Sequence, residues 1–264
     1  MDLGIDGKLA VISGAGGGLG SAAAQDLDRE GVQLFLTDTS ASALEETAAR
    51  LSNVAGFMEA DLTSEESIED LKIAVSKHGV ADILVHMAGI TGAKGDPLEM
   101  TDDDWRTAWE TNFMSAVRMA RGFVPGMAEK GWGRVVFVTS ENAVQPYPDE
   151  AVYNASKAAL LNFTKALSFP YGPKGVLVNS VMPAFIESPM TDGMMDKLAD
   201  ENGSSREEAI QDFLDNERPY LSLKRRGKPE EVAALVAMLC SARASFTNGS
   251  AWRADGGAVA AFNT

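Results

Sequence analysis

The sequence predicts an α/β fold in a single domain over residues 1–264, with helices on both faces of a parallel sheet. Short apolar segments alternate with amphipathic ones along most of the chain, a pattern typical of parallel sheets covered by helices. A glycine-rich turn joins the first expected strand to the first expected helix. With 45 % hydrophobic residues, the 264-residue chain can bury one large core.

The first unit consists of a strand over residues 8–13, a glycine-rich turn and a helix over residues 21–30. Glycines allow the backbone to approach a pyrophosphate, and the helix N-terminus offers free N–H groups and the positive end of its dipole. Glycine-rich turns occur for many reasons, but between a strand and a helix they favour a dinucleotide site. We expect this site at Gly14, Gly16, Gly17, Gly18, Leu19 and Gly20.

The second strand, over residues 32–37, ends at Asp38. A carboxylate at this point can accept hydrogen bonds from the adenosine ribose hydroxyls, although Asp38 could instead be a helix N-cap or a turn residue. In the ribose role it stands where the 2′-phosphate of NADP would lie, and neither Gly17 nor Thr39 offers that phosphate a cation. We therefore expect NAD as the cofactor, in preference to NADP.

The alternation of strands and helices continues to residue 181 and returns near the C-terminus. We expect helices over residues 41–51, 64–77, 151–169 and 229–240, and a long helix capped by residues 101–104 that contains Asn112. Further strands are expected over residues 54–58, 82–86, 135–139, 176–181 and 251–254. Ligands of such sheets bind at the carboxyl ends of the strands. The residues just past the strand ends should therefore face one crevice: Ser13, Asp38, Asp61, Ala88, Ser140 and Pro183.

The strongest catalytic signal lies around Ser140, which follows a buried strand, and around Tyr153 and Lys157 on the next helix. Residues four positions apart share a helix face, so the phenol and the ammonium can enter one site. A free tyrosine titrates at about 10, and its pKa must fall by roughly three units for it to act as a base near neutral pH. A neighbouring Lys cation favours the phenolate. In the alternative interpretation, Tyr153 is a half-buried helix residue and Lys157 is solvated.

Residues 187–226 interrupt the regular pattern. The segment is polar and helical in bias, and it is too long for an ordinary connection. It could be a disordered insert, but its apolar residues favour a mobile substrate lid over the crevice. These residues are Met190, Met194, Met195, Leu198, Phe213 and Leu214.

Composition excludes several classes of function. The formal net charge of −15 argues against binding to nucleic acid. Cys240 is the only cysteine, so no internal disulfide can form, and His78 and His86 give no metal-ligand cluster. The sequence has no long apolar run and no basic-then-apolar N-terminal signal. We therefore expect a cytoplasmic protein with no metal, no membrane and no nucleic acid among its partners.

The motifs together resemble those of the short-chain dehydrogenase/reductase family over nearly the whole chain. The matching positions are Gly14-x-x-x-Gly18-Leu19-Gly20, Asp61-Leu62, Ala88-Gly89, Asn112, Ser140, Tyr153-x-x-x-Lys157, Asn179, Pro183 and Asp255-Gly256-Gly257. The resemblance implies a Rossmann-type, doubly wound sheet of seven parallel strands, a nicotinamide cofactor, and hydride transfer on an alcohol or ketone. It also implies cofactor contacts at Asp61, Leu62, Ala88, Gly89, Tyr153, Lys157, Pro183, Ile186 and Ser188, and a homotetramer or homodimer formed through the helices that carry Asn112 and Tyr153.

The resemblance also implies a role for each catalytic residue. Tyr153 is the general acid/base, Ser140 polarises the substrate oxygen, and Lys157 lowers the pKa of Tyr153 and holds the nicotinamide ribose. Asn112 anchors a water in the proton relay, unless its amide only satisfies a buried backbone group.

The chain departs from the family pattern at three places. His86 and Met87 replace two asparagines, Ala184 replaces a glycine after Pro183, and Ser188 stands where threonine is frequent. His86 either replaces an amide hydrogen bond or is a packed strand histidine.

These residues predict an NAD-dependent oxidoreductase that interconverts a secondary alcohol and its ketone. Glu141 and Asn142 follow Ser140 into the crevice, and buried polar groups need partners. We therefore expect substrate contacts at Ser140, Glu141, Asn142 and Tyr153, and a sugar or polyol as substrate. Alternatively, Glu141 pairs with a lid cation such as Lys224 or Arg225, or points into water. The competing functions are a 3-oxoacyl-thioester (acyl carrier protein) reductase, an epimerase or dehydratase that retains its cofactor, and a non-catalytic dinucleotide-binding protein.

Overall fold

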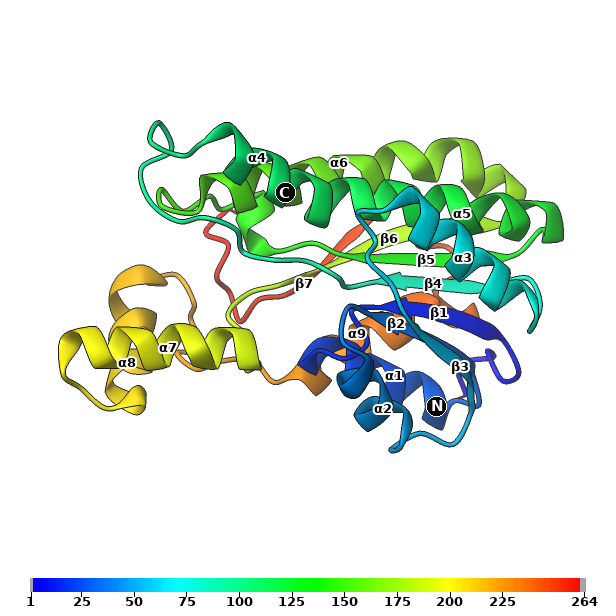
Figure 1. The fold of residues 1–264 in the computed structure, drawn as a ribbon, viewed down its shortest axis with the longest axis horizontal. Helices are drawn as coiled ribbons and strands as arrows, with labels where there is room; N and C mark the ends of the chain where they lie inside the picture. The colour runs from blue at the N-terminus through cyan, green and yellow to red at the C-terminus, as the bar shows by residue number, and fades with distance from the viewer. Residues whose placement is uncertain (1, 262–264) are drawn as a thin grey trace.

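The computed structural model describes residues 2–261 and contains one sheet of seven parallel strands in the order β3-β2-β1-β4-β5-β6-β7 (Figure 1). The order reverses between β1 and β4, which are paired neighbours at the centre of the sheet. This confirms the predicted doubly wound α/β fold. The strands are β1 (Leu9–Ser13), β2 (Gln33–Asp38), β3 (Val54–Glu59), β4 (Ile83–His86), β5 (Gly133–Val138), β6 (Val176–Pro183) and β7 (Ala251–Ala254).

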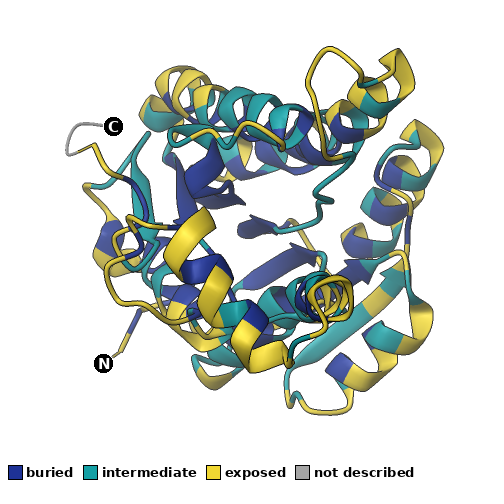
Figure 2. Ribbon diagram, turned by 90° about the vertical axis from the view of Figure 1, so that its left-hand side faces the viewer, coloured by how far each residue is buried: buried dark blue, intermediate teal, exposed yellow. Residues whose placement is uncertain are grey.

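Helices cover both faces of the sheet and bury its apolar side chains, as the burial colours of Figure 2 show. One core lies between the sheet and α1 (Gly18–Arg29), α2 (Ala41–Ala48) and α9 (Pro229–Cys240). The other core lies between the sheet and α3 (Glu65–Ser76), α5 (Ser115–Lys130) and α6 (Ala151–Tyr171). A parallel sheet needs this cover, because both of its faces are apolar.

The first helix starts earlier than predicted, at Gly18 and not at residue 21. The prediction placed these glycines in the turn, where their backbone could approach a pyrophosphate. In the structure the helix begins against the end of β1, where a Cβ on Gly20 would lie 2.0 Å from the Gly14 carbonyl oxygen. Only glycine permits this contact, so α1 can start directly beside the strand end.

The long helix predicted after residues 101–104 is interrupted in its middle. It consists of α4 (Asp102–Trp109), a π-helical turn η1 (Glu110–Met114) and α5. Thr101 and Asp104 form a capping box at its start, as the sequence predicted for the cap. The π turn contains Asn112, and π turns inside helices are frequent at functional sites.

Residues 187–226, the lid segment, form helices and not an irregular insert. They contain α7 (Pro189–Asn202), α8 (Arg206–Asp212) and a π-helical turn η4 (Phe213–Glu217), which project beyond the sheet (Figure 1). The predicted apolar side is present, since Met195, Phe213 and Leu214 are buried in a separate small core. The two ends of the segment meet in a parallel bridge between Ile186 and Gly227, where the Glu187 N–H donates to the Gly227 carbonyl at 2.9 Å.

Candidate active site

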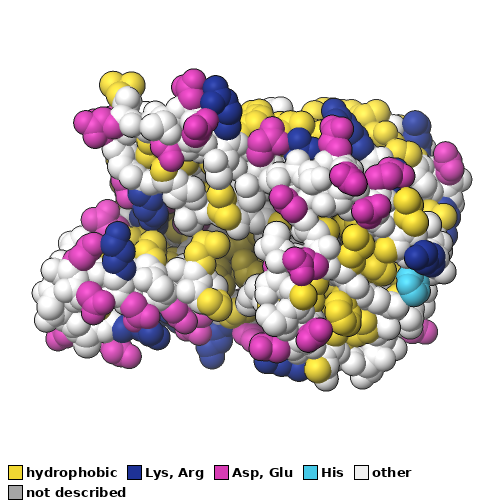
Figure 3. Space-filling view, viewed as in Figure 1, with side chains coloured by type: hydrophobic (Ala, Val, Ile, Leu, Met, Phe, Trp, Pro, Cys, Tyr) yellow, Lys and Arg dark blue, Asp and Glu magenta, His cyan; other side chains and the backbone are white. Residues whose placement is uncertain are grey.

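A cavity of about 610 Å³ lies at the carboxyl ends of the strands, between the sheet and the lid segment. Figure 3 shows this hollow between the two parts, with hydrophobic side chains exposed inside it. Of the predicted site residues, only Gly16 and Asn112 do not line it. Those that do are Gly14, Gly17, Gly18, Leu19, Gly20, Asp38, Asp61, Leu62, Ala88, Gly89, Ser140, Glu141, Asn142, Tyr153, Lys157, Pro183, Ile186 and Ser188.

The glycine-rich turn forms one end of the cavity and fits a dinucleotide pyrophosphate. Gly14 has a φ of +69°, and a Cβ there would lie 2.8 Å from the Ala88 backbone nitrogen, so the turn packs directly on the end of β4. Gly17 caps α1 without any side-chain hydrogen bond. The first N–H groups of this helix therefore stay available to an anion in the cavity.

Asp38 stands at the end of β2 on the wall of the same cavity. Its carboxylate accepts hydrogen bonds from the Gly16 N–H at 3.0 Å and from the Ser40 N–H at 3.3 Å. Ser40, and not Asp38, supplies the side-chain cap of α2. Asp38 is therefore not the helix cap, but its bond to the Ser40 N–H, two residues on, is a turn contact. The contact of Asp38 with the adenosine ribose stays a prediction.

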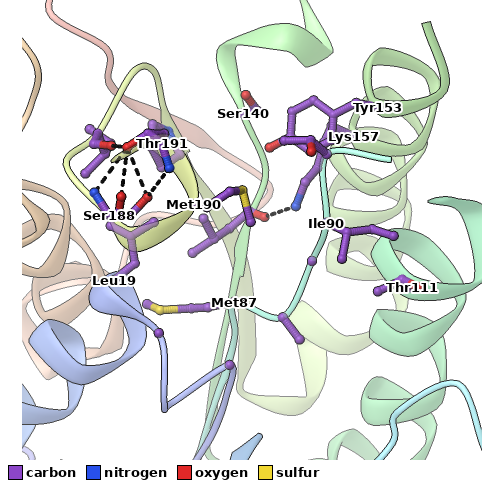
Figure 4. A pocket seen from close by; sticks show the side chains of 18 of the residues that line it. Leu19, Met87, Ile90, Thr111, Ser140, Tyr153, Lys157, Ser188, Met190 and Thr191 are labelled. Carbon is purple, nitrogen blue, oxygen red and sulfur yellow. Dashed lines mark hydrogen bonds between the residues drawn. The ribbon is translucent and has the colours of Figure 1, made fainter. Parts of the chain in front are cut away.

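Ser140, Tyr153 and Lys157 come together at the other end (Figure 4). Lys157 is buried, with 4 % of its surface exposed, and its ammonium donates to the Val138 carbonyl at 3.0 Å. The Nζ atom lies 5.7 Å from the centre of the Tyr153 ring. The alternative in which Lys157 is solvated is therefore wrong, because β5 and α6 hold its charge inside the site.

The pKa values differ from the sequence expectation. Desolvation, together with the negative charge of Glu141, raises the pKa of the Tyr153 phenol above its ordinary value. Desolvation lowers the pKa of Lys157 to about 8. The net effect of the protein groups is therefore to raise the pKa of Tyr153, because burial and the Glu141 carboxylate outweigh the hydrogen bond with Ser140.

Glu141 and Asn142 are buried, and both have partners within the protein. The Ser140 hydroxyl donates to Glu141 Oε2 at 2.7 Å. The Asn142 amide donates to Glu150 Oε2 at 2.6 Å and to Asn154 Oδ1 at 2.8 Å. Both amide hydrogens of Asn142 are thus used inside the protein, which makes it a positioning residue for the loop after β5.

The expectation that a cation of the lid segment pairs with Glu141 is confirmed, but the cation is Arg218 and neither Lys224 nor Arg225. Lys224 lies beside Asp215, and Arg225 binds Glu231. The cation near Glu141 is Arg218, at 4.0 Å between Nε and Oε1. Lys224 and Arg225 have acidic neighbours much closer in sequence, and these satisfy their charges.

Sequence reasoning missed three charged residues that line the cavity: Lys94, Glu150 and Arg218. Glu150 Oε1 accepts from Lys94 at 2.7 Å and from Arg218 at 3.1 Å. The Arg218 guanidinium also stacks on the Tyr147 ring, 3.4 Å from its centre. Arg218 carries no local signal in the sequence, because its carboxylate partner lies 68 positions away.

Asn112 holds the backbone of the site at Ile90, whereas His86 bonds two buried hydroxyl groups. The Asn112 amide donates to the Ile90 carbonyl and to Ser156 Oγ, each at 2.9 Å, and accepts from the Ile90 N–H at 2.8 Å. His86 is fully buried between Ser13 Oγ and Ser115 Oγ, and burial lowers its pKa to about 3. His86 is therefore a buried, neutral strand histidine, and both of its ring nitrogens make hydrogen bonds, which is compatible with its replacing an amide hydrogen bond.

Ser188 lies where the lid segment starts and closes the cavity beside Met190 and Thr191 (Figure 4). Its hydroxyl accepts from the Thr191 N–H at 3.2 Å and so caps α7. The residue links the start of the lid to the cofactor end of the cavity.

Two classes of site are not found in the part of the chain that the structure describes. Residues 2–261 contain no group of three or more His, Cys, Asp or Glu side chains placed to hold a metal ion. None of their helices combines the length and the hydropathy needed to span a membrane.

Known proteins with a similar sequence or structure match this chain over nearly its whole length. The profile of a family described as enoyl-(acyl carrier protein) reductase matches residues 14–259. The crystal structure of L-sorbose reductase from Gluconobacter frateurii with NADPH and L-sorbose is 36 % identical, with a TM-score of 0.92, and covers 99 % of this chain and 100 % of its own.

Two curated enzymes match at similar levels. Meso-2,3-butanediol dehydrogenase of Serratia marcescens is 34 % identical over 97 % of this chain and 96 % of its own length. A 3-oxoacyl-[acyl-carrier-protein] reductase of Vibrio cholerae is 32 % identical over 96 % and 98 %. With the sheet order, the glycine turn and the Ser140, Tyr153 and Lys157 group already in place, these matches show that the chain belongs to the short-chain dehydrogenase/reductase family of oxidoreductases.

Proposed function

We propose that this chain is an NAD-dependent oxidoreductase that interconverts a secondary alcohol, of the sugar or polyol class, with its ketone. The observation that carries the proposal is the meeting of Ser140, Tyr153 and Lys157 at one end of a cavity whose other end is a glycine turn at a helix N-terminus. A nicotinamide cofactor bound in this cavity supplies or accepts the hydride. The chain supplies orientation, charge and the proton.

The roles of the side chains follow from their positions. Tyr153 gives its hydroxyl proton to the ketone oxygen during reduction and takes the alcohol proton during oxidation. Ser140 donates a hydrogen bond to the same oxygen, which carries negative charge in the transition state. Lys157 holds a positive charge beside Tyr153, and Asn112 positions the strand-end loop through Ile90.

Asp38 supports NAD as the cofactor. The cationic residues that line the cavity are Lys94, Lys157 and Arg218. All three bind groups at the end of the cavity where Ser140 lies: Lys157 binds the Val138 carbonyl, and Lys94 and Arg218 bind Glu150. A 2′-phosphate beside Asp38 would therefore meet a carboxylate without a compensating cation. We expect a higher kcat/KM with NAD than with NADP, and Asp38→Ala should narrow the difference. Equal or better use of NADP by the unaltered protein would contradict this preference.

Glu141 supports the polyol substrate. Its Oε1 is 4.0 Å from Arg218 Nε, which is longer than a hydrogen bond, so this oxygen can still accept from a substrate hydroxyl. The related L-sorbose reductase and butanediol dehydrogenase act on polyhydroxylated compounds by their names. Glu141→Ala should lower kcat/KM for a polyol by more than for a simple secondary alcohol, which has no second hydroxyl to lose. Equal losses on both substrates would rule out this role.

A 3-oxoacyl-thioester reductase is the second candidate, and the resemblance to the Vibrio cholerae enzyme supports it. The two candidates differ in the substrate that they need to bind beside Glu141 and Arg218. A screen of polyols, sugars, secondary alcohols and an acetoacetyl thioester, followed at the NADH absorbance, tests the whole proposal. Turnover of the thioester alone would favour the second candidate, and no turnover of any compound would overturn both.

We also propose a homotetramer, formed through α4, α5 and α6. Trp105 and Trp109 on α4 are 38 % and 42 % exposed, and Phe169 on α6 is 66 % exposed. Exposed aromatic side chains on one layer of helices are typical of a protein contact surface.

A further inference from the structure

The hydroxyl of Ser140 has a single proton, and the structure gives that proton to Glu141. Ser140 Oγ lies 2.7 Å from Glu141 Oε2 and 3.1 Å from Asn142 Oδ1, while it accepts from the Asn142 N–H at 3.3 Å. A carboxylate is the stronger acceptor of the two, because hydrogen bonds to charged groups are shorter and stronger. Ser140 cannot donate to Glu141 and to a substrate oxygen with the same proton.

Glu141 occupies a site that does not favour its charge. It is 3 % exposed, and its nearest cation, Arg218, is 4.0 Å away and bound to Glu150. The other titratable groups that face it are Glu150, Tyr147 and Tyr153, none of which is a cation. Burial is the largest cause that raises the pKa of Glu141 to about 7, against the opposing effects of Ser140 and Arg218.

We propose that Glu141 is a positioning residue whose proton decides whether Ser140 can donate to the substrate oxygen. When Glu141 is protonated, its own O–H can donate to Ser140 Oγ, and the Ser140 proton turns to the substrate. When Glu141 is ionised, it withdraws that proton. This inference rests on the proposed function and adds a second ionisation to it, besides that of Tyr153.

The proton of Glu141 comes from solvent and is not consumed in the reaction. The proton that enters the product alcohol still comes from Tyr153, and the hydride still comes from the reduced cofactor, so the overall balance is unchanged. Glu141 acts on the energy of the transition state, and the same transition state is crossed in both directions. Its ionisation must therefore lower kcat/KM for reduction and for oxidation alike.

This requirement separates Glu141 from Tyr153 in a pH profile. Ionisation of Tyr153 lowers kcat/KM for reduction and raises kcat/KM for oxidation, because reduction needs the phenol and oxidation needs the phenolate. Ionisation of Glu141 lowers both as the pH rises through about 7. The loss should approach about 10²-fold, the usual effect of removing one donor to a developing oxyanion.

The experiment measures kcat/KM between pH 5 and 10 in both directions, with a simple secondary alcohol and its ketone, for the unaltered protein, Glu141→Gln and Glu150→Gln. The fall of kcat/KM near neutral pH that is shared by the two directions should disappear in Glu141→Gln, because the amide stays neutral. It should remain in Glu150→Gln and move to lower pH, because loss of that neighbouring negative charge favours ionised Glu141. A common fall that survives in Glu141→Gln, or that disappears in Glu150→Gln alone, would overturn the proposal.

A second readout does not depend on turnover. Because the pKa of Glu141 is higher in the folded chain than in the unfolded chain, the free energy of unfolding should fall as the pH rises from about 4.3 to about 7. This fall should be absent in Glu141→Gln, and in Ser140→Ala it should extend to higher pH, because the lost hydrogen bond favoured the carboxylate. Identical stability profiles for the three proteins would overturn the link between Glu141 and Ser140. Absence of any substrate would overturn only the proposed function.

Discussion

Tyr153 is a proton carrier held in a site that opposes its ionisation. Desolvation and Glu141 raise its pKa, while the buried ammonium of Lys157 lies against a carbonyl and does not reverse this effect. The phenol form, which reduction needs, is therefore the state that the protein groups favour. Oxidation requires additional positive charge near the ring, which a bound oxidised nicotinamide would provide.

Replacing Tyr153 by Phe keeps the ring and removes the proton. We expect kcat to fall by about 10²–10⁴, the usual contribution of a general acid–base group, with little change in cofactor affinity. Steady-state kinetics and cofactor titration measure the two quantities. Tyr220→Phe is the matched control, because Tyr220 is 56 % exposed in the lid segment and should keep full activity. Near-normal turnover in Tyr153→Phe would remove this residue from the mechanism.

The lid segment projects beyond the end of the sheet (Figure 1). Its own core is small, and its buried cation Arg226 binds Asp192 and Thr191 at the base of α7. Its contact with the catalytic end runs through Arg218, which binds Glu150 and stacks on Tyr147. Arg218 thus connects the lid to the loop that precedes α6, and Lys94, which also binds Glu150, contacts Met194 of α7.

We expect residues 187–226 to exchange amide hydrogens faster than the sheet in the free protein, and to become protected when cofactor and substrate are bound. Hydrogen exchange of the two forms measures this, with α9 as an internal reference. Arg218→Ala should raise exchange in the free lid, because it removes the tie to Glu150. Equal protection of the lid in both forms would show that it is fixed structure.

At the scale of helices and strands, features set by neighbouring residues could be predicted from the sequence, and features set by residues distant in the sequence could not. Strand and helix positions were predictable because apolar periodicity and caps such as Thr101 and Ser64 are local signals. The π turn at Asn112 was not, because no residue pattern distinguishes it from an ordinary helix. Arg218 was missed because its role depends on Glu150 and Tyr147, which are distant in the sequence and which only the fold brings near it.

For the whole molecule, one consequence of the exposed aromatic residues is testable directly. Trp105→Glu places a charge on α4, in the surface proposed to join the copies of the chain, so we expect the homotetramer to dissociate into smaller species. Sedimentation velocity measures the mass, and circular dichroism checks that the fold is retained. Leu98→Glu is the control, since this side chain is 94 % exposed outside the helices. A monomeric unaltered protein would contradict the proposal.

At this scale the sequence predicted the order of the elements and the crevice, but not the electrostatics. Strand-end residues such as Asp38 and Ser140 line one cavity because parallel strands end at one edge. The pKa of Tyr153 depends instead on desolvation and on Glu141, and both follow from tertiary packing. Spacing alone placed Lys157 near the phenol and could not show that its charge is shared with a carbonyl.

The bridge between Ile186 and Gly227 makes the lid segment a closed loop whose two ends leave the fold at one point. The bridge holds the two ends of the segment side by side. The entropy cost of closing the loop between them rises only slowly with the number of residues in the loop. We therefore expect changes of length or sequence between these two positions to disturb the sheet little, apart from the contacts that Arg218 makes with Glu150 and Tyr147. Variation of this one segment would then change one wall of the cavity while Ser140, Tyr153 and Lys157 keep their places after β5 and on α6.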